Sequence, residues 1–204
     1  MKRKIPCPCD NAFFVEVPEE IDLDRRAEYM DEIMDGSFMN YDCPSCGKKH
    51  KPEFPINVLW PSRNLRLEVL PELDRGEYYR RRKDPKDAET VIGYPELAER
   101  LSVYRDGLEP AAVEAVKYFL LLKAEENYPD GEISIWYQGR GPEGLEFHLH
   151  GIRDGEVAVS RLPMGIYEKA LEDYRKRPRG ELFGALRFRS YLSIQNMIRP
   201  DELK

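Results

Sequence analysis

The stretch IPCPCDNAFF, residues 5–14, places two cysteines one residue apart between two segments with strand character. A second close pair follows in CPSCG, residues 43–47, after a gap of 33 residues. Zinc takes four ligands in a tetrahedron, and two short turns that each offer two thiolates satisfy this geometry. The spacing therefore predicts a closed, structural zinc site whose ligands are all 4 cysteines of the chain, Cys7, Cys9, Cys43 and Cys46.

The two turns differ in how well they suit this task. In the second, Pro44 fixes φ, and Gly47 can take the left-handed conformation that ends a cysteine turn. In the first, C-x-C is tighter than the common C-x-x-C, and no glycine follows Cys9. We expect Asp10 or Asn11 to take the left-handed conformation instead, since these residue types tolerate it better than most.

Three other interpretations compete with zinc. Disulfides are disfavoured in a reducing compartment. A thioredoxin-type redox pair at Cys43 and Cys46 needs a βαβ context, whereas the flanks resemble a hairpin. Buried inert thiols would leave the spacing a coincidence. His50 lies three residues beyond Gly47, and beside four thiolates we expect it on the surface or next to the ligands.

Composition bounds the class of protein. The 204 residues are 41% hydrophobic and 34% charged, with a net charge of −6, which suits a soluble globular protein and disfavours non-specific binding to nucleic acid or anionic lipid. The longest apolar run, VKYFLLL (116–122), is too short to span a bilayer, and the N-terminus has no apolar signal region. We therefore expect a cytoplasmic protein without a membrane partner.

Residues 1–74 are predicted to form a β-rich zinc-ribbon domain with one inserted helix. The alternating segments around each cysteine pair predict strands, and INVLW and LRLEVL predict a hairpin across residues 61–64. Residues 18–24 are acidic and irregular, with Asp22 or Asp24 as a helix N-cap. Residues 25–34 predict the helix, which Gly36 ends.

Residues 75–90 have linker character, because they are charged and contain hardly any aliphatic side chain. They also contain the best candidate for contacting nucleic acid, a basic run beside Tyr78 and Tyr79. A nucleic-acid-associated zinc ribbon is accordingly one alternative function. It would use Arg80, Arg81, Arg82 and Lys83, with Arg175, Lys176, Arg177 and Arg179 from a second basic cluster.

Residues 91–204 are predicted to form an α+β domain. Residues 94–101 predict a short helix, and 109–128 predict a long helix buried on more than one side. Three alternating runs, 132–139, 145–151 and 156–162, predict an antiparallel meander. Residues 164–177 return to helix, and 186–195 alternate weakly, which favours a strand.

His148 and His150 occupy one face of the middle strand, and an enzyme site near this pair is the second alternative. Two histidines are two ligands short of a metal site, so exposed or partner-facing side chains are expected. The sequence contains no nucleotide-binding fingerprint, no H-E-x-x-H and no G-x-S-x-G. We therefore expect no enzymatic activity.

Several stretches together resemble the bacterial CpXC family, small proteins named for paired cysteine motifs. They are IPCPCDNAFFVEV, IMDGSFMNYDCPSCGKKHKPEFP and VYRDGLEPAAVEAVKYFLLL, in which a D-G-L turn opens a long helix before a meander. The resemblance covers roughly 1–175 and implies that the four cysteines are metal ligands. The resemblance leaves the biochemical function open, and the missing glycine after Cys9 departs from the family's pattern.

Together these observations predict a zinc-binding cytoplasmic protein that acts as a protein-interaction or assembly module. Its expected partner is another protein or a homo-oligomer, rather than nucleic acid. The sequence does not identify the partner or the biological process.

Overall fold

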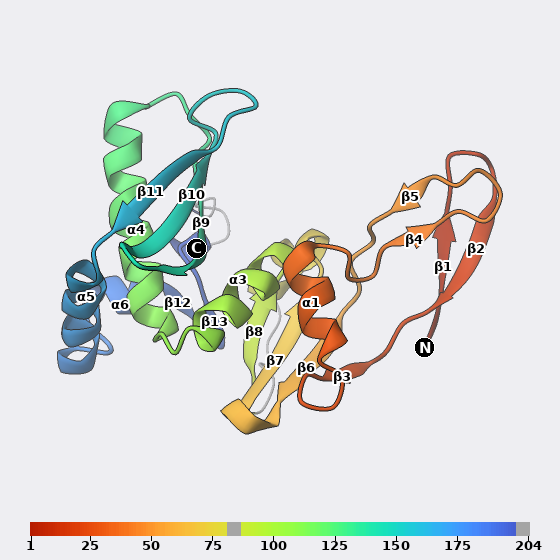
Figure 1. The fold of residues 1–204 in the computed structure, drawn as a ribbon, viewed down its shortest axis with the longest axis horizontal. Helices are drawn as coiled ribbons and strands as arrows, with labels where there is room; N and C mark the ends of the chain where they lie inside the picture. Colours follow the sequence, from red (N-terminus) through yellow and green to blue (C-terminus); the bar gives the residue numbers. More distant parts are fainter. Residues whose placement is uncertain (81–86, 199–204) are drawn as a thin grey trace. The chain divides into compact units, whose positions relative to one another are not determined.

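A computed structural model describes residues 1–80 and 87–198 and shows a mixed α+β protein (Figure 1), which confirms the predicted class. The chain forms two compact units, Met1–Ala98 and Glu99–Lys204. The division falls within helix α3, Tyr94–Arg105, rather than in the segment 75–90 that the sequence suggests as a linker. Within the described ranges, no helix is both long and apolar enough to cross a bilayer.

The first unit contains two short hairpins and one longer sheet. Strands β1 and β2 pair antiparallel, as do β4 and β5, while β6 pairs antiparallel with β7 and parallel with β3, and β7 pairs parallel with β8. The elements are β1 Lys2–Pro6, β2 Ala12–Glu16, β3 Glu20–Asp22, α1 Glu28–Asp35, β4 Tyr41–Asp42, β5 Lys49–His50, β6 Ile56–Trp60, η1 Pro61–Arg63, β7 Leu65–Leu70, η2 Glu72–Asp74, α2 Arg75–Arg80 and β8 Glu89–Ile92.

The β6–β7 hairpin forms where the alternation predicts it. Val58 and Leu67 face each other in register and are fully buried, because every second residue of both strands points into the core. The turn follows from Asn64, whose φ of 49° is left-handed, a conformation that asparagine tolerates.

Helix α1 also forms as predicted, with a later start. Gly36 ends it with a φ of 73°, and the helix buries Ile33. The predicted N-cap is wrong, since Ala27 occupies that position without a side-chain hydrogen bond. Asp22 instead accepts hydrogen bonds from the backbone of Asp24 and Arg25, which makes a turn before the helix.

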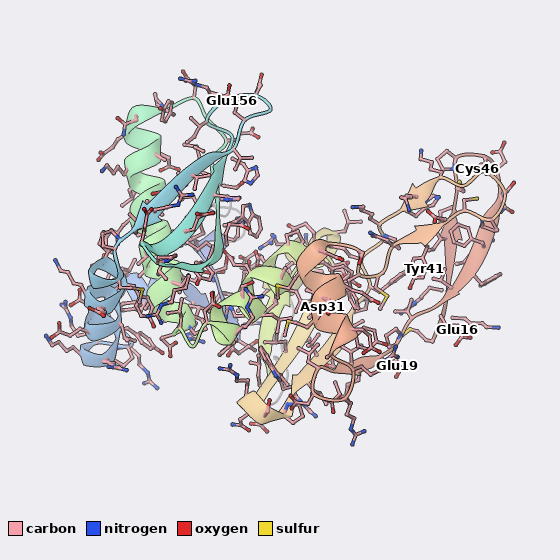
Figure 2. The ribbon with its side chains drawn as sticks, viewed as in Figure 1. Glu16, Glu19, Asp31, Tyr41, Cys46 and Glu156 are labelled. Atoms are coloured by element: carbon pink, nitrogen blue, oxygen red, sulfur yellow. The ribbon has the colours of Figure 1, made fainter. Side chains whose placement is uncertain are left out.

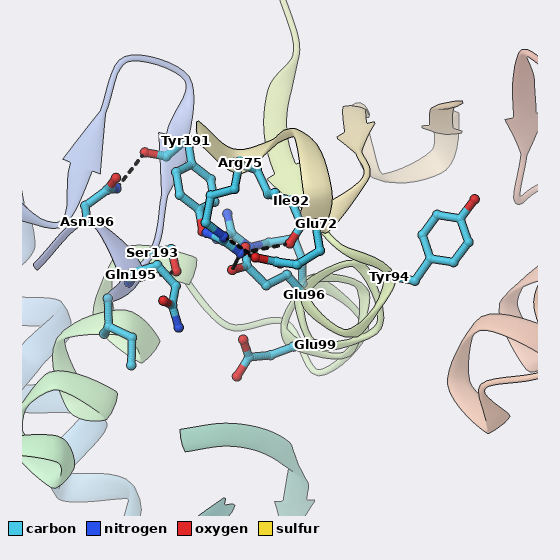
Figure 3. A network of polar contacts seen from close by, with 12 residues as sticks. Glu72, Arg75, Ile92, Tyr94, Glu96, Glu99, Tyr191, Ser193, Gln195 and Asn196 are labelled. Carbon is cyan, nitrogen blue, oxygen red and sulfur yellow. Dashed lines mark hydrogen bonds and ion pairs between the residues drawn. The ribbon is translucent and has the colours of Figure 1, made fainter. Parts of the chain in front are cut away.

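Three elements lie in segments predicted as irregular or linker. Strand β3 lies within the acidic stretch 18–24, and α2 and the start of β8 occupy the two ends of 75–90. Tyr78 and Tyr79 are buried on α2, at 1% and 8% exposure, which fixes the helix in the unit. Arg75 Nη2 donates to Glu96 Oε1 at 2.9 Å and to Glu72 Oε2 at 2.7 Å (Figure 3). The charged residues here thus serve tertiary contacts, which composition does not reveal.

The second unit is built around a helix and a meander. Strand β10 lies between β9 and β11, antiparallel to both, as predicted. The elements after α3 are α4 Pro110–Asn127, β9 Ser134–Gly141, β10 Gly144–His150, β11 Ala158–Leu162, α5 Met164–Lys176, α6 Glu181–Ala185, β12 Arg187–Phe188, β13 Tyr191–Leu192 and α7 Gln195–Ile198. The single strand suggested for 186–195 is instead a tight β12–β13 pair that leads into α7.

Four charged side chains are buried in the second unit beside its apolar core. Lys117 Nζ donates to Glu99 Oε2 at 2.6 Å and to Glu114 Oε1 at 3.2 Å. The remaining oxygens accept backbone N–H groups, Tyr137 on Glu99 and Ile194 on Glu114, while Arg100 donates to the carbonyl of Leu192. Every charge thus has an opposite charge or a backbone partner, as burial demands.

Candidate metal centre

The four cysteines lie in the two hairpin turns of the first unit. Cys7 and Cys9 stand in the turn between β1 and β2, and Cys43 and Cys46 stand in the turn between β4 and β5. Figure 2 labels Cys46, at the far end of its hairpin, beside the β1–β2 turn. The topology therefore brings together two cysteine pairs that are far apart in the sequence.

The first cysteine turn has a left-handed residue even though no glycine follows Cys9. Asp10 adopts the left-handed conformation, with a φ of 62°. Its N–H donates to the carbonyl of Cys7 at 3.1 Å, and the N–H of Cys7 donates to the carbonyl of Asn11 at 2.8 Å, which closes the turn. Asp10 thus takes the position that glycine holds elsewhere, as one of the two predicted candidates.

The second turn closes in a similar way around its glycine. Gly47 has a φ of 70°, and its N–H donates to the carbonyl of Cys43 at 2.8 Å. The N–H of Cys43 donates to the carbonyl of Lys48 at 2.9 Å. Each turn therefore holds its cysteines on a hydrogen-bonded backbone.

The sulfur atoms of the four cysteines converge on one point. All four Sγ atoms lie within 4.8 Å of one another. The distance from Cys7 Sγ to Cys46 Sγ is 3.6 Å, and that from Cys9 Sγ to Cys43 Sγ is 3.8 Å. A tetrahedron with a metal–sulfur bond of about 2.3 Å has an edge of about 3.8 Å. The residues present therefore fit a tetrahedral metal ion such as zinc.

Burial divides the four thiols into two pairs. Cys7 and Cys43 are buried, whereas Cys9 and Cys46 are exposed. Although burial raises the pKa of Cys43, the backbone N–H groups of Cys46 and Ser45 and the side chain of Asn11 lower it to about 6.

Cys7 shows the opposite balance. Although the N–H of Cys9 lowers its pKa, burial and the three neighbouring thiols raise it to about 12. The surroundings thus favour the thiolate at Cys43 and the protonated thiol at Cys7. A bound divalent ion would remove this difference between Cys7 and Cys43, because a thiol that coordinates a metal loses its proton.

Two nearby side chains complete the surroundings of the cluster. Asn11 Nδ2 donates to Cys43 Sγ at 3.8 Å, a contact that the sequence did not predict. His50 is not a member of the cluster. Its ring packs edge-on against Phe13, with 5.6 Å between centroids, so it lies beside the site as a packing residue.

The other candidate sites are not assembled in the same way. Arg81, Arg82 and Lys83 lie outside the described residues, and the buried Tyr78 and Tyr79 present no face on which a base could stack. In the second basic cluster, Lys176 pairs with Glu172 at 2.6 Å on the surface of α5.

His148 and His150 do share one face of β10, as the alternation predicts. His148 Nε2 lies 3.3 Å from Glu146 Oε1, and His150 is exposed at the end of the strand. Across residues 1–80 and 87–198, the cysteine cluster is the one group of three or more side chains placed to share a metal ion. The histidine pair gains no third ligand there.

The fold and the cluster define a mixed α+β protein with a four-cysteine site suited to binding a metal. The family model of the CpXC protein matches residues 5–117, which include all four cysteines, and the chain belongs to this family. An uncharacterised protein of Treponema pallidum (strain Nichols) is 30% identical over 215 residues, covering 95% of this chain and 97% of the relative. No solved structure matches the chain.

Proposed function

We propose that the chain is a cytoplasmic zinc protein in which a structural four-cysteine zinc ribbon supports a non-enzymatic protein-interaction or assembly module. The observation that carries the zinc assignment is the spacing of the sulfur atoms, 3.6 Å and 3.8 Å between cysteines of different hairpins. Reduced thiols are the state that the cytoplasm maintains.

A structural role for the ion follows from the ligand set. Four thiolates complete a tetrahedron and leave no open position for water or substrate, which is the arrangement of structural rather than catalytic zinc. The hairpin β4–β5 has only two residues in each strand, and an isolated hairpin is marginally stable at best. An ion that joins it to β1–β2 would stabilise both.

Metal analysis tests the zinc assignment. Purified protein is expected to contain about one zinc per chain, measured by inductively coupled plasma mass spectrometry after extensive dialysis. The double variant Cys43→Ser/Cys46→Ser should lose this zinc, because it retains only two thiolates. Ser45→Ala changes the same turn without touching a thiol and should retain it. Full zinc in the double variant would overturn the assignment.

The interaction role is supported by what accompanies the site. A closed centre performs no chemistry on a substrate, and the sequence carries no catalytic motif beside it. We propose a protein partner or a second copy rather than nucleic acid, because the net charge is −6 and the tyrosines of the basic segment are buried. We propose no membrane partner.

A further inference from the structure

Asn11 contributes to both cysteine turns, although it is not a ligand candidate itself. Its backbone carbonyl accepts the N–H of Cys7 at 2.8 Å, which closes the first turn. Its side chain reaches the other hairpin, where Nδ2 donates to Cys43 Sγ at 3.8 Å. Because the backbone hydrogen bond fixes the start of this side chain relative to Cys7, the amide has a defined position beside Cys43.

The sulfur of Cys43 depends more on protein hydrogen-bond donors than the sulfurs of Cys9 and Cys46 do. Cys43 is only 2% exposed, whereas Cys9 and Cys46 are exposed to water. Four thiolates carry two more negative charges than a divalent ion neutralises, and a buried charge costs free energy unless polar groups meet it. A hydrogen bond to an ionised acceptor is stronger than one between neutral groups.

The donors that meet Cys43 come from both hairpins. The backbone N–H groups of Ser45 and Cys46 belong to its own turn. Asn11 comes from the other turn, and within the described part of the chain it supplies the one side-chain N–H that donates to a sulfur of the cluster. Its amide therefore joins the two hairpins at the same place where a metal ion would join them.

From these observations we propose that Asn11 is a positioning residue of the metal centre. Its amide holds Cys43 Sγ in place and offsets part of the negative charge of the four thiolates, so that the site binds a metal ion more tightly. Residues that hydrogen-bond a metal ligand typically contribute about 10–100-fold to metal affinity. This role rests on the metal centre proposed above and concerns a residue outside its ligand set, so it can fail while the centre stands.

Cobalt(II) titration of the reduced full chain, in competition with a chelator at constant pH, tests this role. Cobalt bound to thiolates absorbs through sulfur-to-metal charge transfer, and the energy of this band reports the charge on the sulfur atoms. We expect Asn11→Leu, which has a similar branched shape but no donor, to bind cobalt about 10–100-fold more weakly than the wild type. Its charge-transfer band should move to longer wavelength, since a sulfur without the hydrogen bond gives up an electron more readily.

Two further variants separate the hydrogen bond from a general loss of stability. Asn11→Asp keeps the shape of the side chain but replaces the donor with a negative charge, so it should bind cobalt more weakly than Asn11→Leu. Asn40→Leu makes the same exchange three positions before Cys43, where Asn40 Nδ2 donates to the carbonyl of Gly36 at 3.0 Å and not to a sulfur. This control should leave both the cobalt affinity and the charge-transfer band unchanged.

Several results would overturn the role of Asn11. Equal affinities and identical bands for the wild type and both Asn11 variants would do so and leave the four-cysteine centre standing. A weaker affinity without a band shift would also do so, because a loss of stability lowers affinity without changing the charge on the bound sulfur atoms. The same changes in Asn40→Leu as in Asn11→Leu would show that the effect is not specific. A wild type that takes up no cobalt would overturn the metal centre and the role of Asn11 together.

Discussion

At the scale of single residues, the first cysteine turn depends on an aspartate in a glycine-like conformation. Asp10 has a φ of 62°, which costs an L-residue roughly 1–2 kcal/mol, with aspartate among the better tolerated. A β-branched residue has no such tolerance.

We therefore expect Asp10→Val to lower the free energy of unfolding by about 1–2 kcal/mol. Asp10→Gly is the matched variant and should differ from the wild type by less than about 1 kcal/mol, because relief of strain offsets the added chain entropy. Urea denaturation of the zinc-loaded protein measures both. Equal stability of the valine and glycine variants would show that the turn does not impose this conformation.

Part of the metal site could be predicted from the sequence. The pairing of Cys7 and Cys9 with Cys43 and Cys46 was predictable, because ligand type and spacing are local properties. The contact of Asn11 with Cys43 was not, since it joins residues 32 positions apart and depends on how the hairpins pack. The one local signal near this contact was Asp10, which stands where a glycine is expected after Cys9.

At the scale of elements, the proposed ion is expected to strengthen the junction between the two cysteine hairpins, which the contacts of Asn11 with Cys43 and of Phe13 with His50 also join. We predict that a competing chelator will speed hydrogen exchange at the amides of Cys43 and Gly47, which close the second turn. Exchange in strand β6 should remain slow, because β6 is paired on both sides and Val58 is fully buried.

Hydrogen exchange followed by NMR, with and without the chelator, measures this difference. Restoring zinc should restore protection in the same turn. Uniform loss of protection in β6 and in the hairpins would contradict a local role and indicate that the ion holds the whole first unit.

Some elements were predictable from periodicity and others were not. Helix α4 and strands β6 and β7 follow patterns long enough to stand out, and the structure confirms them. Strands β3 and β8 were not predicted, because they are short and pair in parallel with strands distant in sequence. The charged residues around them suggested irregular chain instead. Helix α2 was not predicted, because it is stabilised by the tertiary burial of its two tyrosines rather than by a local pattern.

At the scale of the whole molecule, stability is expected to depend on the buried charges of the second unit. Burial raises the pKa of Glu99 to about 7 from an ordinary 4.5, although Lys117 beside it acts in the opposite direction. The folded protein therefore binds this proton more tightly than the unfolded chain. The resulting stability is fully present below about pH 4.5 and is lost as the pH rises through about 7.

We predict that the wild type loses more unfolding free energy than Glu99→Gln as the pH rises through this window. Urea unfolding at a series of pH values measures the difference. Glu172→Gln is the control, because the pKa of Glu172 lies below its ordinary value beside Lys176, and its profile should run parallel to the wild type here. Parallel profiles of the wild type and Glu99→Gln would show that the Glu99 carboxyl does not titrate in this range.

The proposed function depends on a single zinc ion held by four sulfur atoms. X-ray absorption at the zinc edge of the purified protein tests this most directly, because it reports the atoms around the metal. We predict a first shell of four sulfur atoms at about 2.3 Å. A shell that contains nitrogen or oxygen, or fewer than four sulfur atoms, would contradict the four-cysteine site.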